Sequence, residues 1–281
     1  KAATMKVSEL FVRCLENEGV DTIFGIPGEE NIDVMDALLE SGVRFVTTRH
    51  EQGAAFIADV FGRLTGKAGV CLATLGPGAT NLVTGVADAN MDRAPLVAIA
   101  GQAATTRQHK ESHQYYDLVK LFAPISKYST SIIEPDITAE VIRKAFKQSE
   151  AEKPGVSFIE LPENIAKLET DKAPLRVQSA RAPTPPLVKI VEAADLISHA
   201  KYPSVMAGNG VIRQHACDQL VKFADRLNLP VATTFMAKGA IPFSHPHSLG
   251  TVGLQAHDWV ACGFDRADVV VCVGYDMVEY H

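Results

Sequence analysis

The chain has 281 residues, a length that suggests two domains at about 150 residues each. Hydrophobic residues make up 47% and charged residues 21%, which is ordinary for globular proteins and excludes a disordered chain. Lys and Arg number 27 against 33 for Asp and Glu, a net charge of -6, so a large basic surface for nucleic acid is not expected.

The first 165 residues alternate helical patterns with short apolar, β-branched runs, which is typical of β-α-β units and predicts a parallel sheet. Six parallel-type strands fit this part of the chain. Five of them are expected at Thr22 to Phe24, Arg44 to Thr47, Gly69 to Thr74, Pro95 to Ala100 and Gly155 to Leu161. Helices are expected at Ser8 to Glu18 with Ser8 as its cap, Asn31 to Glu40, His50 to Leu64, Ala79 to Asn90 and Ala139 to Glu152.

Residues 170–187 are rich in proline, carry mixed charge and show no periodicity, which predicts an extended linker. Beyond it the alternation resumes and indicates a Rossmann-like domain. Its helices are expected at Leu187 to His199, Gln214 to Leu227 and near Asp258 to Gly263, and its strands at Ser204 to Ala207, Val231 to Thr233 and Asp268 to Val273. Only three strands are clear before the chain stops, so this domain is either small or incomplete. We expect two doubly wound α/β domains, residues 5–169 and 188–281.

The sequence shows no membrane-spanning segment, no secretory signal and no paired cysteines. No apolar run approaches the roughly 18 residues that span a bilayer, and no secretory signal is evident at the N-terminus, so we expect a cytoplasmic protein that does not enter membranes. The five cysteines are scattered without a C-x-x-C pair, which disfavours both a disulfide framework and a zinc site.

The segment from Thr48 to Ala55 lies where a parallel strand passes into a helix, at the sheet edge where ligands bind in open α/β folds. Glu51 falls in the first helical turn. One interpretation is a carboxylate that interacts with the helix dipole beside His50 as a capping residue. The other is a buried carboxylate that faces a ligand, with small residues after it allowing close approach.

The segment Gly76-Pro77-Gly78 ends a buried strand and opens a helix, so its backbone N–H groups can cradle a ligand. It lacks the lysine of a P-loop and the spacing of a dinucleotide motif. An ordinary tight turn explains it equally well. Asn81, one turn into the helix, can point to the same edge.

A polar stretch from Thr105 to Tyr116 holds His109, His113 and Gln114 and is expected to form a surface loop over the sheet edge. His109 and His113 are four residues apart without an adjacent Glu, so no metal site is predicted. In the second half, Gly208-Asn209-Gly210 is a weak nucleotide-binding signal, and His245 and His247 are expected in a surface turn.

Four ordered blocks carry a family resemblance. They are FGIPGEEN (24–31), RHEQGAAFIAD (49–59), LATLGPGATNLVTGVADA (72–89) and DRAPLVAIAGQ (92–102). Together they resemble the pyrimidine-binding domain of thiamine diphosphate enzymes of the acetolactate synthase group. The resemblance continues through HQYYDLVKLFAPISKYS (113–129) and the turn LPEN (161–164), and more weakly through the second domain. It covers nearly the whole chain but only about half of such an enzyme.

The resemblance implies roles for particular residues. Glu51 is implied as the catalytic carboxyl that hydrogen-bonds the cofactor's aminopyrimidine, so that the cofactor can remove its own weakly acidic thiazolium proton. Gln114 is implied to reach toward the bound intermediate. The other implied cofactor-binding residues are Pro27, Gly28, His50, Gly76, Pro77, Gly78 and Asn81.

The family's diphosphate and Mg²⁺ motif is absent from this sequence, and in the family it belongs to a third domain of another subunit. The resemblance therefore implies half an active site, a homodimer or homotetramer, and a chain that is inactive alone. The ending Gly274 to His281 is similar to that of the catabolic, flavin-free synthases rather than to the flavin-binding ones, so FAD is not expected.

The function implied is a carboligase that decarboxylates pyruvate on thiamine diphosphate and joins the product to a second pyruvate as 2-acetolactate. Other thiamine diphosphate enzymes of 2-keto acids are the nearest alternative: glyoxylate carboligase, pyruvate oxidase or a decarboxylase. A non-catalytic module for nucleotide binding or assembly is the alternative from a different class.

Overall fold

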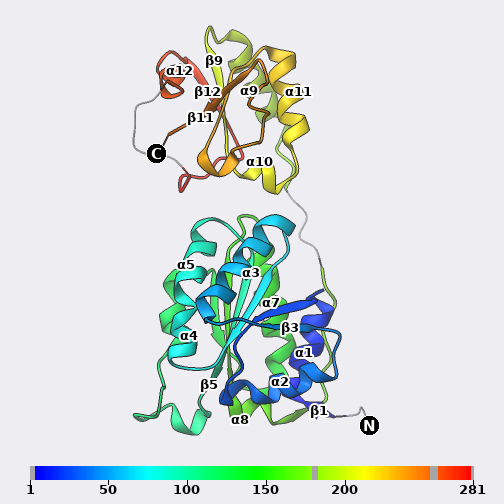
Figure 1. Cartoon of the computed structure of the whole chain (residues 1–281). Helices are drawn as coiled ribbons and strands as arrows, with labels where there is room; N and C mark the ends of the chain where they lie inside the picture. The colour runs from blue at the N-terminus through cyan, green and yellow to red at the C-terminus, as the bar shows by residue number, and fades with distance from the viewer. Residues whose placement is uncertain (1–3, 179–182, 254–258, 280–281) are drawn as a thin grey trace. The chain divides into compact units, whose positions relative to one another are not determined.

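The computed structural model describes residues 4–178, 183–253 and 259–279. The chain forms two compact units, Lys1–Ala182 and Pro183–His281, each built as helices around a parallel sheet (Figure 1). The expected α/β class with two parallel sheets is confirmed.

The first unit is built on a six-stranded sheet in which every neighbouring pair is parallel. The strand order is β3-β2-β4-β5-β7-β6. Since β2 has β3 on one side and β4 on the other, the winding of the chain reverses between β2 and β4, and the carboxyl ends of these strands flank a switch point. The strands are β2 (Thr22–Gly25), β3 (Arg44–Thr47), β4 (Gly69–Ala73), β5 (Leu96–Gln102), β6 (Tyr128–Ser131) and β7 (Val156–Pro162).

Helices cover both faces of this sheet, with one apolar core on each side. One core gathers side chains of α1, α2 and α7, and the other gathers those of α3, α5 and α6. The helices are α1 (Val7–Asn17), α2 (Ile32–Leu39), α3 (Glu51–Thr65), α4 (Pro77–Asn81), α5 (Val83–Met91), α6 (Leu118–Phe122), α7 (Thr138–Glu150) and α8 (Glu163–Ala166).

Small residues bring α3 close to the sheet. A Cβ added at Gly69 would lie 2.0 Å from the carbonyl oxygen of Ala58, and one at Gly62 would lie 2.2 Å from that of Pro95. Since such distances are sterically forbidden, only glycine permits this approach. The close packing holds the N-terminus of α3, where Glu51 lies, at a defined place above the sheet edge.

A cluster of charges joins α3 to α5. The Arg63 guanidinium donates to both oxygens of Asp59 at 2.9 Å, to Asp88 at 2.8 Å and to Asp92 at 2.5 Å. The Asp59 side chain is 1% exposed. Burial raises the pKa of Asp59 and the ion pair with Arg63 opposes that rise. Arg63 is therefore the main group that compensates a buried carboxylate.

A second buried ion pair joins Glu18 to Arg143, between the end of α1 and α7. Burial raises the pKa of Glu18 in spite of the lowering effect of Arg143. A carboxyl whose folded-state pKa is raised stabilises the fold below its unfolded pKa, and that contribution is lost as pH rises through the folded value.

We therefore expect the free energy of unfolding of the wild-type chain to fall, relative to that of Glu18→Gln, as the pH rises above about 4.3, the ordinary pKa of a glutamate side chain. Glutamine keeps the shape but does not titrate. Urea unfolding followed by circular dichroism at several pH values measures this difference. A difference that stays constant or grows with pH would contradict the expectation.

Three differences between the elements of the first unit and the predicted ones have a clear physical reason. The helix expected at Ala79 to Asn90 is two helices, α4 and α5, that meet at Leu82. The sixth strand, β6, has the polar sequence YSTS and lacks the apolar pattern used to find the others. Ser8 is buried within α1 and does not cap it, because the helix begins one residue earlier.

The start of the first unit is tied to the beginning of the predicted linker. Strand β1 (Met5–Lys6) pairs antiparallel with β8 (Glu169–Thr170). The Asn17 side chain donates a hydrogen bond of 2.8 Å to the Leu175 carbonyl. The part of the proline-rich segment near Leu175 is thus held against the first unit.

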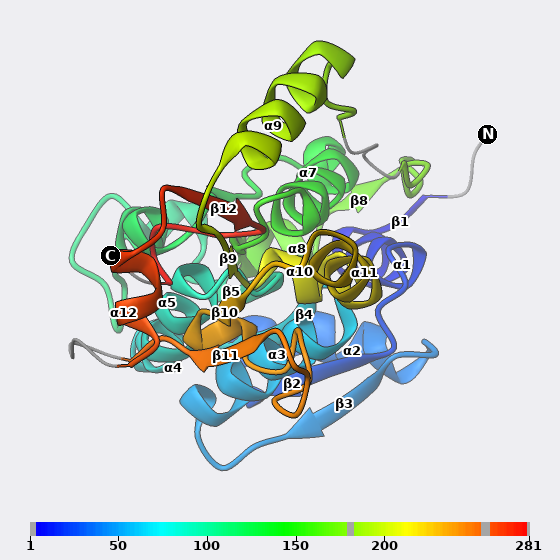
Figure 2. The same cartoon turned by 90° about the horizontal axis from the view of Figure 1, so that it is seen from above.

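The second unit has a four-stranded parallel sheet in the order β11-β10-β9-β12. Helices α11 and α12 lie on opposite sides of it in both views (Figures 1 and 2). Helix α9 has no buried residue. The elements are α9 (Leu187–His199), β9 (Pro203–Ala207), α10 (Gly210–Arg213), α11 (Cys217–Leu227), β10 (Val231–Thr233), β11 (Ser248–Thr251), α12 (Ala261–Asp265) and β12 (Val269–Val273).

The prediction of three strands for the second domain was one short. Strand β11, with the sequence SLGT, was missed because it has no continuous apolar run. Of the helix expected near Asp258 to Gly263, the beginning lies outside the described residues, and α12 starts at Ala261. Trp259, the one tryptophan of the sequence, is 94% exposed. Within the described ranges, no helix is both long and apolar enough to cross a membrane.

Candidate active site

The carboxyl edge of the first sheet brings together segments that are far apart in the sequence. The loops that follow β2 and β4 flank the switch point, and α3 begins after β3, the next strand along. Open α/β sheets bind ligands at this edge. The residues at these loops are those that the sequence analysis singled out.

Glu51 is the first residue of α3, and its side chain is largely buried, at 9% exposure of the residue. Asn81, at the end of α4, donates from Nδ2 to Glu51 Oε2 at 3.0 Å. His50 is the helix cap, because its Nδ1 accepts a hydrogen bond from the Gln52 N–H at 3.1 Å. The structure therefore places a carboxyl and an amide, 30 residues apart in the chain, side by side at the sheet edge.

The turn Gly76-Pro77-Gly78 lies against this carboxyl. Gly76 has a φ of +54°, in the left-handed region, and Pro77 is the first residue of α4. A Cβ added at Gly78 would be 3.5 Å from Glu51 Oε1 and 2.9 Å from the Thr74 methyl carbon. The position therefore has no room for a side chain, and the turn passes close to the second Glu51 oxygen.

Gln114 packs on the other side of the same turn. A Cβ added at Gly76 would come within 2.7 Å of both the Cβ and the carbonyl oxygen of Gln114. Gln114 has a φ of +56°, and its side chain is exposed. His109 and His113 are also exposed, on the loop of residues 103–117, as a surface loop requires.

Pro27 and Gly28 follow β2 and lie at the switch point. A Cβ added at Gly28 would collide with Thr74 at 2.4 Å, so this turn touches the segment after β4. Thr74 Oγ1 donates to Glu30 Oε2 at 2.7 Å across the same gap. The contact between Thr74 and Glu30 was not predicted, although both residues lie within the segments that carry the family resemblance. A single sequence gives no sign that two residues 44 positions apart are in contact.

Electrostatics at the other end of this edge centre on Glu160, on β7. Glu160 is 5% exposed, and its burial raises its pKa, with the hydrogen bond from Gln102 acting in the opposite direction. Burial also raises the pKa of Tyr115, with Asp117 and Glu160 adding to the effect. Hydrogen bonds from Lys120 lower the pKa of Asp117.

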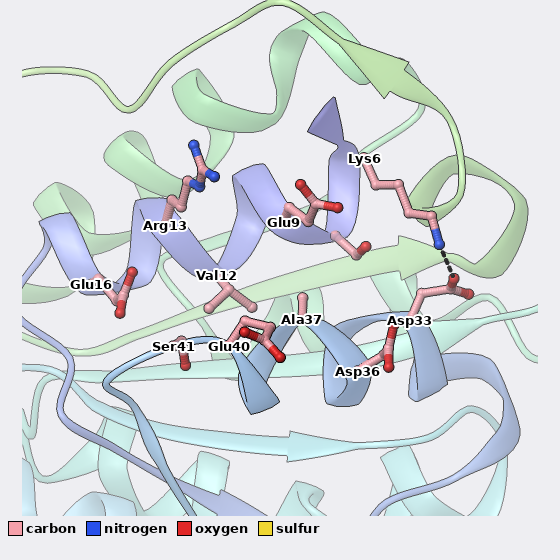
Figure 3. A pocket seen from close by; sticks show the side chains of 11 residues that line it. Lys6, Glu9, Val12, Arg13, Glu16, Asp33, Asp36, Ala37, Glu40 and Ser41 are labelled. Atoms are coloured by element: carbon pink, nitrogen blue, oxygen red, sulfur yellow. Dashed lines mark ion pairs between the residues drawn. The ribbon is translucent and has the colours of Figure 1, made fainter. Parts of the chain in front are cut away.

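A hollow of about 330 Å³ lies elsewhere, between α1 and α2 on the opposite face of the sheet from α3 (Figure 3). Its polar lining includes Lys6 and Asp33, whose charged atoms are 3.9 Å apart, and the carboxylates of Glu9, Glu16, Asp36 and Glu40. Surface ion pairs of this kind contribute little energy. Within the described ranges, no group of three His, Cys, Asp or Glu side chains is arranged to hold a metal.

The switch point of the second unit lies between β9 and β12, where Gly208-Asn209-Gly210 follows β9. The backbone N–H groups of this turn are all bonded within the chain. Gly208 donates to the Val273 carbonyl, Asn209 to Glu279 Oε2 and Gly210 to the Gly274 carbonyl, each at 2.8 Å. Glu279 is 7% exposed and also accepts from Thr234 Oγ1 at 2.5 Å.

Comparison with known proteins agrees with this architecture. Residues 5–121 match the N-terminal TPP binding domain of thiamine pyrophosphate enzymes, and residues 190–281 match the central domain of the same enzymes. The chain belongs to the thiamine pyrophosphate enzyme family.

Within this family, the chain is similar to proteins named acetolactate synthase. It is 38% identical over 277 residues to a probable acetolactate synthase large subunit of Methanocaldococcus jannaschii, covering 96% of this chain and 47% of that protein. It is 36% identical over 275 residues to an acetolactate synthase of Bacillus subtilis, covering 97% and 48%. An acetolactate synthase of Mycobacterium bovis is 38% identical over 272 residues, covering 95% and 44%. The chain spans about half the length of these relatives.

Proposed function

We propose that this chain supplies the pyrimidine-binding half of the active site of an acetolactate synthase. The observation that carries the proposal is the largely buried Glu51–Asn81 pair at the carboxyl edge of the sheet, beside the Gly76–Gly78 turn. The relatives are named acetolactate synthase, which favours this activity over glyoxylate carboligase, pyruvate oxidase, a decarboxylase or a non-catalytic module.

The residues present fit an aminopyrimidine ring. The ring carries nitrogen atoms that accept or donate hydrogen bonds in its plane, and the largely buried Glu51 carboxyl can share a proton with one of them. Gly78 has no side chain to stand between its backbone and that carboxyl, so the turn approaches Glu51 closely. When bound, thiamine diphosphate supplies a carbanion centre and an electron sink for decarboxylation.

Each residue has a defined part in this proposal. Asn81 holds Glu51 Oε2, so that Oε1 faces Gly78 and the proposed ring position. Gly76 and Pro77 shape the turn, and Pro27 and Gly28 form the facing wall at the switch point. His50 orients the start of α3. Gln114, held against Gly76, reaches toward pyruvate or the intermediate derived from it.

We propose that a second copy of the protein completes the site, as a homodimer or homotetramer. Helix α3, which carries Glu51, exposes apolar side chains along one stripe, with Ile57 43%, Val60 48% and Leu64 80% exposed. Residues spaced by three and four along a helix share a face, and such a face is suited to burial by another chain.

The proposed domains are residues 5–169 and 188–281, with 170–187 as the linker.

Thiamine diphosphate enzymes of this group use Mg²⁺, and some also bind FAD. We propose that Mg²⁺ is held, with the diphosphate, by a domain outside this chain. We propose that FAD is not required, because the N–H groups of the Gly208–Gly210 turn are engaged by Glu279 and two carbonyls rather than free to bind a phosphate. The segment around Glu279 favours the catabolic, flavin-free type of acetolactate synthase.

We propose a cytoplasmic location, which the five free cysteines support.

The test is acetolactate formation from pyruvate by the complete gene product, with thiamine diphosphate and Mg²⁺ and without added FAD. Accumulation of acetolactate supports both the activity and flavin independence. If pyruvate is not consumed, acetolactate synthase activity is excluded, and glyoxylate and other 2-keto acids are the next substrates to try. The 281-residue chain alone is expected to be inactive, since it holds half a site.

A further inference from the structure

The loop of residues 103–117, which carries Gln114, leaves the sheet at the end of β5 and returns before α6. Its tip is exposed, and Gln114 packs against the active-site turn at Gly76. The position of the loop must therefore depend on other contacts. The contacts at its two ends identify the groups that do so.

Both ends of the loop are bonded to one buried side chain. Gln102 is fully buried, and its Nε2 donates to the Tyr116 carbonyl at 3.0 Å, close to the loop's return. Its Oε1 accepts from the N–H of Ala103, the first loop residue, at 2.9 Å. The two ends, 13 residues apart, are thus joined through a single amide group.

Glu160 holds that amide group in place. Its Oε2 accepts the second hydrogen of Gln102 Nε2 at 2.8 Å, from the neighbouring strand β7. With this bond every donor of the Gln102 amide is used, and the rotation of the amide is set. A buried polar group that loses its partner costs about 1–3 kcal/mol, so the arrangement resists change.

We propose that Glu160 and Gln102 are positioning residues, which hold the loop of residues 103–117 so that Gln114 lies beside Gly76, in the turn that also approaches Glu51. This inference rests on the proposed role of Gln114 in the site. Glu160 acts through Gln102 and does not touch substrate. The pair places the substrate-facing side of the site independently of the Glu51–Asn81 pair, which places the cofactor-facing side.

The first experiment measures the loop directly in the 281-residue chain. Exchange of the hydrogen-bonded amides of this loop, such as those of Arg107 and Tyr115, is expected to quicken in Glu160→Ala and in Gln102→Ala. It is expected to keep the wild-type rate in Glu160→Gln, whose amide oxygen can accept the same bond. The matched control is Ser157→Ala, which removes a buried 2.8 Å hydrogen bond to Ala145 from the same strand without touching the loop. Unchanged exchange in both alanine variants, or an equal change in the control, overturns the proposal.

The second experiment uses the complete gene product with pyruvate. Misplacing a substrate-positioning group by about 1 Å costs on the order of 10²-fold in rate, so kcat is expected to fall by about that factor in Glu160→Ala and to recover in Glu160→Gln. The affinity for thiamine diphosphate is expected to change by no more than about twofold, since Glu51 is not affected. A parallel loss of cofactor affinity would overturn the positioning role. If the wild type makes no acetolactate, the proposed function fails, while the exchange measurement still decides the loop.

Discussion

Replacing Glu51 by glutamine is expected to lower acetolactate formation by the complete gene product by about 10² to 10⁴-fold. Glutamine retains an oxygen that can accept the bond from Asn81, so the shape of the site is kept. What is lost is a group that can hold and release a proton beside Gly78. The measurement is the steady-state rate with pyruvate at saturating thiamine diphosphate and Mg²⁺.

The matched control for this prediction is Glu9→Gln. Glu9 is also a carboxylate in the first turn of a helix, but it belongs to α1 on the opposite face of the sheet. Both substitutions remove the same interaction with a helix dipole, worth about 0.3–1 kcal/mol. A Glu51→Gln rate within a few-fold of the control would mean that Glu51 only stabilises its helix.

Replacing Arg63 by methionine is expected to destabilise the first unit by about 3 kcal/mol, the lower part of the range for breaking a buried ion pair, because Arg63 itself is one-third exposed. The loss leaves the Asp59 carboxylate buried without its cation, beside the carboxylates of Asp88 and Asp92. Although burial lowers it, the pKa of Arg63 is raised by Asp59 and Asp92, which shows how strongly the cluster holds the positive charge.

Urea unfolding of the 281-residue chain, followed by circular dichroism, measures this loss. The control is Lys120→Met, which breaks the 2.7 Å ion pair between Lys120 and Asp117 on the surface. Exposed pairs contribute about 0–1 kcal/mol, so little change is expected. Equal effects of the two substitutions would show that the cluster around Arg63 behaves as a surface feature.

The strands that could be predicted are those in which every residue is buried, because such a strand is a continuous run of apolar residues in the sequence. Strands β4 and β5 are continuous apolar runs, buried along their whole length, and both were placed within two residues. Strand β6 is made of Tyr, Ser and Thr and is half-buried at the sheet edge, where no apolar run is required. Strand β11 was missed for the same reason.

In the candidate site, too, some residues could be predicted from the sequence and some contacts could not. Glu51 and the Gly76–Gly78 turn were found because each lies in a contiguous block of residues that resembles a family. The Gln102–Glu160 and Thr74–Glu30 contacts join residues 58 and 44 positions apart, and they depend on the order and register of strands. A single sequence carries no signal for such pairs, although each residue taken alone is ordinary.

Trp259 has a practical consequence for optical measurements. Because the Trp259 indole, in the second unit, is exposed to water in the folded chain, its emission is expected near the long-wavelength limit before any denaturant is added. Tryptophan emission is therefore a poor probe of unfolding for this chain, which is why circular dichroism is used for the Arg63 variant. The same property makes it a background-free sensor: a shift of the emission to shorter wavelength on mixing with another chain would report that this surface has been covered.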